Sequence, residues 1–229
     1  MSRAADEVQR LYSALYDAIV EQRLPPGTRL TELNLVEVFK ANRNHVRAAL
    51  RDLAHLKLVR IEMNRGAFVE EPSPEQAKDV FAARRVVEKA IIEQAVARLS
   101  ARDKKAIQAH ISKEDALGHD PAKPEFIRLS GEFHRMLARI AGNQVLADML
   151  DSLIARSSLI IALYEVRSGV QCSHDEHHIL AQAILQQDAP TAIQAMEQHL
   201  IAIEQRLKLG PREESQVDLF EVFGDMGSR

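Results

Sequence analysis

Cysteine and aromatic residues are scarce in this chain of 229 residues. It contains one cysteine, Cys172, and no tryptophan, and aromatic residues make up 4% of the sequence. Because one cysteine cannot form an internal disulfide, we expect a protein of a reducing compartment, the cytoplasm. With so few aromatic side chains, a core of Leu, Ile, Val and Ala suits the composition, and such a core is typical of packed helices.

Long apolar runs are also missing. The longest run, residues 158–163, is far shorter than the roughly 20 residues that a membrane helix needs. The first ten residues carry charge throughout and lack the apolar core of a secretory signal. The sequence therefore predicts no membrane association.

The net charge of −3 gives no general argument for nucleic acid, but its distribution does. Residues 22–69 hold nine Lys and Arg against four Asp and Glu, whereas the chain from Pro72 onward holds 19 against 23. A basic segment joined to an acidic body suggests that the basic part meets a polyanion. Ordinary surface charge is the alternative explanation.

Apolar spacing in the N-terminal third predicts three helices. The first covers about residues 6–22 and ends before Leu24-Pro25-Pro26-Gly27, since proline and glycine terminate helices. Thr31 can cap the second helix, and the third begins near Asn42.

Two short strands are predicted next, at residues 58–61 and 67–69, on either side of a tight turn at Asn64-Arg65-Gly66. Three helices followed by a small hairpin indicate a winged helix-turn-helix. We assign residues 1–71 to this DNA-binding domain.

The rest of the chain is predicted to be helical. After a linker at residues 71–74, helical patterns cover 74–99, 101–117, 124–141, 144–166, 171–187 and 190–209. The predicted fold class is therefore mainly α, with an N-terminal winged helix-turn-helix and a C-terminal antiparallel all-helical bundle. We assign residues 72–209 to effector binding and dimerisation, and residues 210–229 to an acidic, flexible tail.

The third predicted helix has an arginine face and an apolar face. Arg43, Arg47 and Arg51 recur every four residues and form one stripe, while an apolar stripe lies on the opposite side. The planar guanidinium pairs with phosphate or with the major-groove edge of guanine. Asn42 and Asn44 stand at the helix start, which enters the groove in this motif.

Arg65 at the tip of the predicted hairpin is a further candidate for DNA contact, in the minor groove or at a phosphate. A solvated arginine face on the helix and an ordinary turn residue at the tip are the alternatives.

The N-terminal motifs resemble GntR-family regulators. The resemblance covers nearly all of residues 8–70. It rests on Leu24-Pro25-Pro26-Gly27-Thr28-Arg29-Leu30, Val46-Arg47-Ala48-Ala49-Leu50-Arg51-Asp52-Leu53 and Arg65-Gly66-Ala67-Phe68-Val69. That family usually has Ser-Arg-Thr-Pro-Val-Arg-Glu-Ala-Leu at the start of the recognition helix. Here the segment is Asn42-Arg43-Asn44-His45-Val46-Arg47-Ala48-Ala49-Leu50, which keeps the Arg, Val, Arg, Ala and Leu.

Three of the nine histidines lie on apolar stripes of different predicted helices. His134, His177 and His199 share their faces with Leu, Ile, Met and Ala side chains. Helical bundles often build metal sites from facing helices, and neutral imidazole binds zinc, nickel, copper or iron. The alternative is three hydrogen-bonded core histidines.

The C-terminal motifs resemble the FCD domain of the FadR-like GntR subgroup, over about residues 75–208. The resemblance rests on Glu132-Phe133-His134, Ala141-Gly142-Asn143, Glu176-His177, Ala183-Ile184 and His199-Leu200. Many members bind a divalent metal through one Asp and three His, and the metal holds a small organic acid. The resemblance implies a zinc or nickel site at His134, His177 and His199, with Ser130 at the position of the usual Asp.

An arginine next to the metal is also implied by this resemblance, because it often helps to hold the acid. Arg84, with Glu88 four residues later, is the first candidate and Arg156 the second. The alternative for Arg84 is an exposed helical ion pair with Glu88. Without a metal, the histidines and an arginine could still bind an anion.

Together these features predict a homodimeric regulator of double-stranded DNA. A small carboxylate bound in the helical domain would release it from its operator, as for a repressor. A helical metalloenzyme that uses the three histidines is the main alternative, with an open metal position supplied by the missing Asp. A DNA-binding architectural protein without an effector is the second.

Overall fold

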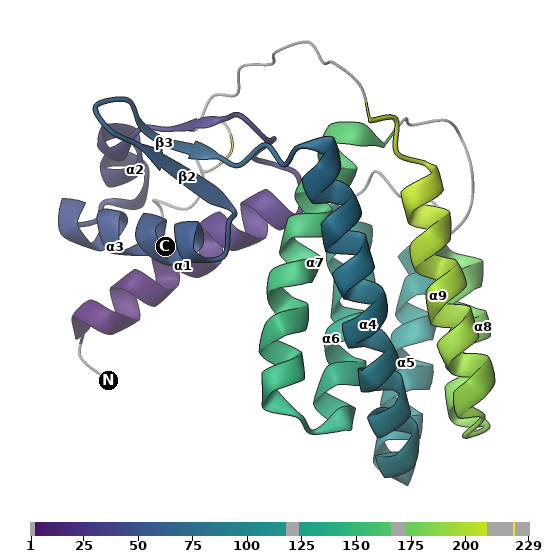
Figure 1. The fold of residues 1–229 in the computed structure, drawn as a ribbon. Helices are drawn as coiled ribbons and strands as arrows, with labels where there is room; N and C mark the ends of the chain where they lie inside the picture. Colours follow the sequence, from purple (N-terminus) through teal and green to yellow (C-terminus); the bar gives the residue numbers. More distant parts are fainter. Residues whose placement is uncertain (1–2, 118–123, 166–172, 210–221, 223–229) are drawn as a thin grey trace. The chain divides into compact units, whose positions relative to one another are not determined.

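The computed structural model describes residues 3–117, 124–165, 173–209 and 222 (Figure 1). Contacts divide the chain into two units, and residues 158–163 of α7 belong with the first. The N-terminal elements are α1 (Arg3–Val20), β1 (Arg29–Leu30), α2 (Glu32–Phe39), α3 (Arg43–His55), β2 (Val59–Glu62) and β3 (Gly66–Val69). The later helices are α4 (Pro74–Arg98), α5 (Ala101–Leu117), α6 (Pro124–Ala141), α7 (Gln144–Tyr164), α8 (Ser173–Leu185) and α9 (Ala189–Gln205). The predicted mainly helical fold class is confirmed.

The first unit is the predicted winged helix-turn-helix. Its sheet has the order β1-β3-β2 with antiparallel pairing, and Phe68 of β3 faces Arg29 on one side and Arg60 on the other. β1 is not predicted by the sequence pattern, because two residues are too few to show alternation. Its pairing with β3 makes it a strand.

The turn between α2 and α3 depends on two residues. Lys40 takes the left-handed conformation (φ 49°) and ends α2. Asn42 then caps α3, since its side chain accepts a hydrogen bond from the backbone N–H of Asn44. Thr31 stands at the N-cap position of α2, but its side chain makes no capping hydrogen bond, so that predicted side-chain cap is wrong.

α3 buries one face and exposes the other, as the sequence predicts. Val46, Ala49, Leu50 and Leu53 are buried. α3 packs against α1 and α2, whose buried residues include Leu11, Leu15 and Leu35. The arginine face is therefore presented away from this small core.

The second unit is a bundle in which α4 packs on α6 and α9, α5 on α6 and α8, and α8 on α9. Its core is aliphatic, as the shortage of aromatic residues predicts. The connection between α6 and α7 turns at Gly142 (φ 66°), where Arg98 donates to the carbonyl of Ala141. The positive φ of Gly142 favours glycine at this turn, and a Cβ there would also displace the end of the Arg98 side chain.

No helix within the described ranges has the length and apolar character that a membrane crossing needs. Cys172 and most of the predicted acidic tail lie outside the described residues.

Asp188 provides a test of the local chemistry of α9. Its carboxylate accepts from the backbone N–H of Thr191 at 3.2 Å and from the Thr191 hydroxyl at 2.6 Å. We expect Asp188→Ala to lower the free energy of unfolding in urea by about 1 kcal/mol. Asp188→Asn should retain most of the stability, because an amide oxygen also caps a helix. Equal stability of the wild type and both variants would contradict this role.

Candidate functional site

The exposed face of α3 carries the predicted DNA-contacting residues. Arg43, Arg47 and Arg51 are all exposed, as are Asn42 and Asn44. Glu32 in the first turn of α2 joins two of the arginines, with its carboxylate 2.7 Å from Arg43 Nε and 2.9 Å from Arg47 Nε. The side-chain carbonyl oxygen of Asn42 already caps α3, so this oxygen is less available to a base edge.

The hairpin presents three arginines around one aromatic ring. The guanidinium carbons of Arg29, Arg60 and Arg65 lie 6.0, 5.0 and 5.7 Å from the centroid of the Phe68 ring. Glu62 pairs with both Arg60 and Arg65. Arg65, at the wing tip, is the most exposed of the paired arginines, with 72% of its side chain accessible. The wing therefore offers a charged tip, and its strand β2 packs against the arginine-bearing helix α3.

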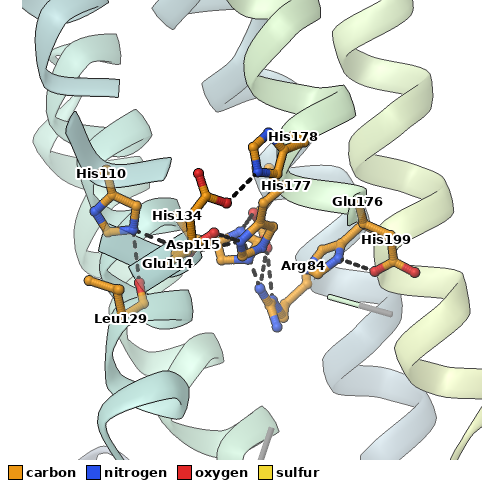
Figure 2. Close-up of polar contacts among 11 residues, drawn as sticks. Arg84, His110, Glu114, Asp115, Leu129, His134, Glu176, His177, His178 and His199 are labelled. Atoms are coloured by element: carbon orange, nitrogen blue, oxygen red, sulfur yellow. Dashed lines mark hydrogen bonds and ion pairs between the residues drawn. The ribbon is translucent and has the colours of Figure 1, made fainter. Parts of the chain in front are cut away.

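The bundle brings the three predicted histidines together (Figure 2). His134 comes from α6, His177 from α8 and His199 from α9, and all three are buried. One ring nitrogen of each lies within 4.8 Å of the others. The ring of Phe133, itself fully buried, lies 4.7 Å from that of His177 and forms an apolar wall.

A separate glutamate holds the Nδ1 atom of each histidine. Glu88 of α4 lies 2.5 Å from His134 Nδ1, and Glu176 of α8 lies 2.7 Å from His199 Nδ1. Glu114 of α5 places both oxygens 3.0 Å from His177 Nδ1. A histidine that donates through Nδ1 keeps the lone pair of Nε2 for a metal, and such carboxylate partners are typical of metal-binding histidines.

The carboxyls differ in their protonation. Burial would raise the pKa of Glu88, but the charges of Arg84 and His134 and their hydrogen bonds lower it to about 2. For Glu114, burial is likewise outweighed by hydrogen bonds from His110 and His177, and its pKa is about 2. Burial raises the pKa of Glu176 to about 7. Burial also lowers the pKa of His134, and it lowers the pKa of His199 well below the usual value. These two rings are therefore neutral at pH 7.

Arg84 belongs to the same buried network. Its guanidinium lies 2.7 Å from Glu88, donates to the Ser157 hydroxyl at 3.0 Å and comes within 3.5 Å of His134 Nδ1. The Arg84 and Glu88 side chains are 4% and 1% exposed. The alternative of an exposed ion pair is therefore wrong, because the apolar stripe of α4 carries this pair into the core.

The structure also tests whether the residues suit a metal. The Nε2 atoms of His177 and His199 are buried and have no hydrogen-bond partner in the described part of the chain. A buried, unpartnered nitrogen is costly unless something binds it. Three imidazoles with ring nitrogens this close together are a suitable donor set for zinc or nickel. The cluster could therefore bind a metal.

Ser130 and Arg156 are the two other residues that the sequence predicts for this site. Ser130 is half-buried on α6, one turn before His134, on the same side of the helix. Arg156 is a half-buried residue of α7 and makes no hydrogen bond or ion pair with the described residues. Glu132 pairs with Arg128 on the surface and takes no part in the cluster.

His110 and Glu114 are parts of the site that the sequence analysis did not single out. His110 Nε2 lies 3.1 Å from the carbonyl oxygen of Leu129 and 3.3 Å from Glu114. A signal was available, since both residues fall on the apolar stripe of Ile107 and Ile111 at helical spacing. An imidazole and a carboxylate on a buried stripe need partners inside the core.

The buried network predicts a large stability loss on breaking the Arg84–Glu88 pair. In metal-free buffer with a chelator, we expect Glu88→Gln to lower the free energy of unfolding by about 3 kcal/mol, because Arg84 is left as an unpaired buried charge. Glu132→Gln breaks a surface pair with the same spacing and should cost about 0.5 kcal/mol or less. Equal losses in the two variants would refute the buried assignment.

The difference in stability between the wild type and Glu88→Gln should also depend on pH. Because the pKa of Glu88 is about 2 in the folded protein against an ordinary 4.5, its contribution to stability is complete above the ordinary value. That contribution is lost as the pH falls toward 2. The stability difference between wild type and Glu88→Gln should therefore narrow below about pH 4.5.

Comparison with known families assigns both units. Residues 79–202 match the FCD domain, and residues 7–69 match the family described as bacterial regulatory proteins, gntR family. The HTH-type transcriptional repressor RspR of Escherichia coli is 24% identical over 201 residues, covering 87% of this chain and 88% of that protein. The galactonate operon transcriptional repressor of Escherichia coli is 26% identical over 228 residues, covering 89% and 97%.

Two solved structures support the fold. Escherichia coli McbR/YncC superposes with a TM-score of 0.78 at 17% identity, covering 90% of this chain and 99% of that one. A putative transcriptional regulator GntR from Rhodococcus sp. RHA1 gives a TM-score of 0.70 at 24% identity, covering 87% of this chain and 97% of that one.

The family consists of transcription regulators, which excludes the metalloenzyme alternative. An architectural protein without an effector is also disfavoured, because FCD is an effector-binding domain. The chain belongs to the GntR family of bacterial regulatory proteins, as a DNA-binding transcription regulator of the FadR-like subgroup with an FCD domain.

Proposed function

We propose that this regulator is a repressor that a small organic acid releases from DNA, and that the acid binds at a zinc or nickel ion held by His134, His177 and His199. It works in the cytoplasm, where its DNA is. Two relatives of similar length are named as repressors, which supports repression as the default.

One observation carries the proposal: the Nε2 atoms of His177 and His199 are buried beside a third histidine and have no partner among the residues that the structure describes. Each ring is fixed through Nδ1 by its glutamate, so the chain itself sets the direction of the three lone pairs. A bound divalent ion supplies positive charge and open coordination positions to an effector oxygen.

The charges of the site favour an anionic effector. Glu88 and Glu114 are ionised and balance the two charges of a divalent ion, Glu176 with a pKa of about 7 is only partly ionised, and Arg84 adds a full positive charge. Ser130 adds none of the negative charge that an Asp would bring. The buried site with its metal is therefore net positive, and a carboxylate neutralises it. Arg84 orients that carboxylate through its guanidinium.

On the DNA side, the outer face of α3 enters the major groove, with Arg43, Arg47 and Arg51 in contact with bases and phosphates. Asn42, Asn44 and Arg65 of the wing contribute as the neighbouring contacts. Two chains form a homodimer, so that two winged helices contact a two-fold-related operator. Arg156 remains a second effector contact in this proposal.

Metal content tests the histidine site. Protein purified without a histidine tag should contain about one equivalent of zinc or nickel per chain. His134→Ala and His177→Ala should each lose it, because each removes one of three ligands. Elemental analysis after dialysis against each ion measures the result.

His178→Ala is the matched control, because His178 follows His177 on α8 but is exposed and pairs with Asp115. It should keep the metal. Ser130→Asp should bind metal more tightly by adding a carboxylate one turn before His134. If the wild type stays metal-free after dialysis, the metal part of the proposal is wrong. The acid would then be held by hydrogen bonds from Arg84 and the histidines alone.

DNA binding tests the arginine face. We expect Arg47→Ala to lose about 1–3 kcal/mol of discrimination between an operator and a scrambled duplex, as for removal of one bidentate base contact. Fluorescence anisotropy with the duplex that the wild type enriches from a randomised library measures it. Arg128→Ala, which removes an exposed arginine of the bundle, should bind as the wild type does. Indistinguishable binding by Arg47→Ala would place the recognition surface elsewhere.

A further inference from the structure

Glu32 is an acidic residue on a surface where DNA is expected to bind. A carboxylate beside a polyanion weakens binding unless it has a compensating role. Glu32 lies in the first turn of α2, and its side chain is 27% exposed. It bridges Arg43 and Arg47, which belong to successive turns of α3.

We propose that Glu32 is a positioning residue for base recognition: it fixes Arg43 and Arg47 by their Nε atoms and its charge opposes non-specific phosphate binding. The inference rests on the proposed role of α3 in DNA contact, and concerns which residue makes that contact selective.

The atoms involved support the positioning role. Glu32 accepts from Nε of Arg43 at 2.7 Å and from Nε of Arg47 at 2.9 Å through both oxygens. The terminal nitrogens of these arginines make no hydrogen bond to any residue in the described ranges. An end-on contact with the two acceptors of guanine uses those terminal nitrogens. The carboxylate therefore holds the inner nitrogen of each arginine and leaves the outer pair for DNA.

Holding the side chains in advance favours a specific complex over a non-specific one. A free arginine loses rotamer freedom when it is fixed on a base edge, and a preorganised arginine loses less. Arg51 provides a contrast within the same helix, since it is exposed and has no ion-pair partner among residues 3–117, 124–165 and 173–209. On this inference, Arg51 contacts phosphate, whereas Arg43 and Arg47 contact bases.

Glu32 also remains charged when it acts. Hydrogen bonds from Arg47 and Arg43 lower its pKa against a smaller opposing effect of burial, so it is ionised at neutral pH. On non-specific DNA, the phosphates that approach the two arginines also meet the negative charge of this carboxylate, which opposes their binding. On the operator, the base edge accepts from atoms that Glu32 does not occupy.

The experiment compares Glu32→Gln with Glu132→Gln in the full chain. Both variants remove one surface carboxylate paired with arginine, but Glu132 lies on the bundle helix α6. The probes are the duplex that the wild type enriches from a randomised library and a scrambled duplex of the same composition. Dissociation constants for each are measured over a range of salt concentrations.

We expect Glu32→Gln to bind the scrambled duplex at least about threefold more tightly and the enriched duplex no more tightly than the wild type. The ratio of the two constants should fall accordingly. Its log–log salt dependence on the scrambled duplex should steepen by about one phosphate contact. Glu132→Gln should show neither change.

Glu32→Asp separates position from charge. The shorter side chain keeps the charge but cannot bridge both arginines, so the enriched duplex should bind more weakly while the scrambled duplex binds as before. Thermal unfolding of each variant confirms the fold, since these exposed pairs contribute little to stability. If the ratio of the two dissociation constants in Glu32→Gln equals that of the wild type, this inference is overturned while the proposed function stands. If the wild type enriches no sequence, the proposed function fails and the inference fails with it.

Discussion

Hydrogen bonds between glutamates and the Nδ1 atoms of buried histidines are the interaction on which the helical unit depends. Burying His134, His177 and His199 in an aliphatic core is costly unless each polar nitrogen has a partner. Glu88, Glu114 and Glu176 supply that partner on one side of each ring. These contacts tie α4 to α6, α5 to α8 and α8 to α9. Within the described part of the chain, the Nε2 atoms of His177 and His199 are then buried without a partner, so the centre of the bundle could bind a metal.

Burial gives the same Arg–Glu chemistry two different uses in this chain. The Arg84–Glu88 pair is almost fully enclosed, and separating it would leave a charge in a medium that solvates it poorly. Such a pair fixes geometry permanently and suits a ligand site. The Glu32 carboxylate instead joins arginines whose side chains are 56% and 50% exposed. Water solvates the terminal nitrogens of these arginines, so in the proposed complex those nitrogens can bind DNA while Glu32 keeps the Nε atoms.

The sequence predicted those features of the protein that follow from a periodic spacing of residues. The helical periods, the buried and exposed faces of α3, and the gathering of three histidines all follow from spacing on amphipathic helices. It missed β1, which has two residues and exists only through its pairing with β3. It also missed the partnership of Glu114 with His177, because these residues are 63 positions apart and helix packing alone brings them together. For Arg84 it left burial undecided, since i,i+4 spacing is the same on a surface and in a core. Local patterns therefore predict which side of a helix is buried, whereas the partners across the core depend on tertiary contacts.

Replacing the usual Asp by Ser130 changes the chemistry of the proposed site in a definite direction. Three imidazole ligands favour zinc or nickel over hard cations such as magnesium, which prefer carboxylate oxygens. With one anionic ligand fewer, the ion is held less tightly by the chain alone, and an effector carboxylate supplies the missing charge. Metal and effector then increase each other's affinity by the same factor, as any pair of linked ligands must. A regulator built in this way responds to the acid only where metal is available, and retains metal best where the acid is present. Glu88 and Glu114 fix their histidines before either ligand binds, so binding of the proposed metal loses less free energy to the ordering of its ligands.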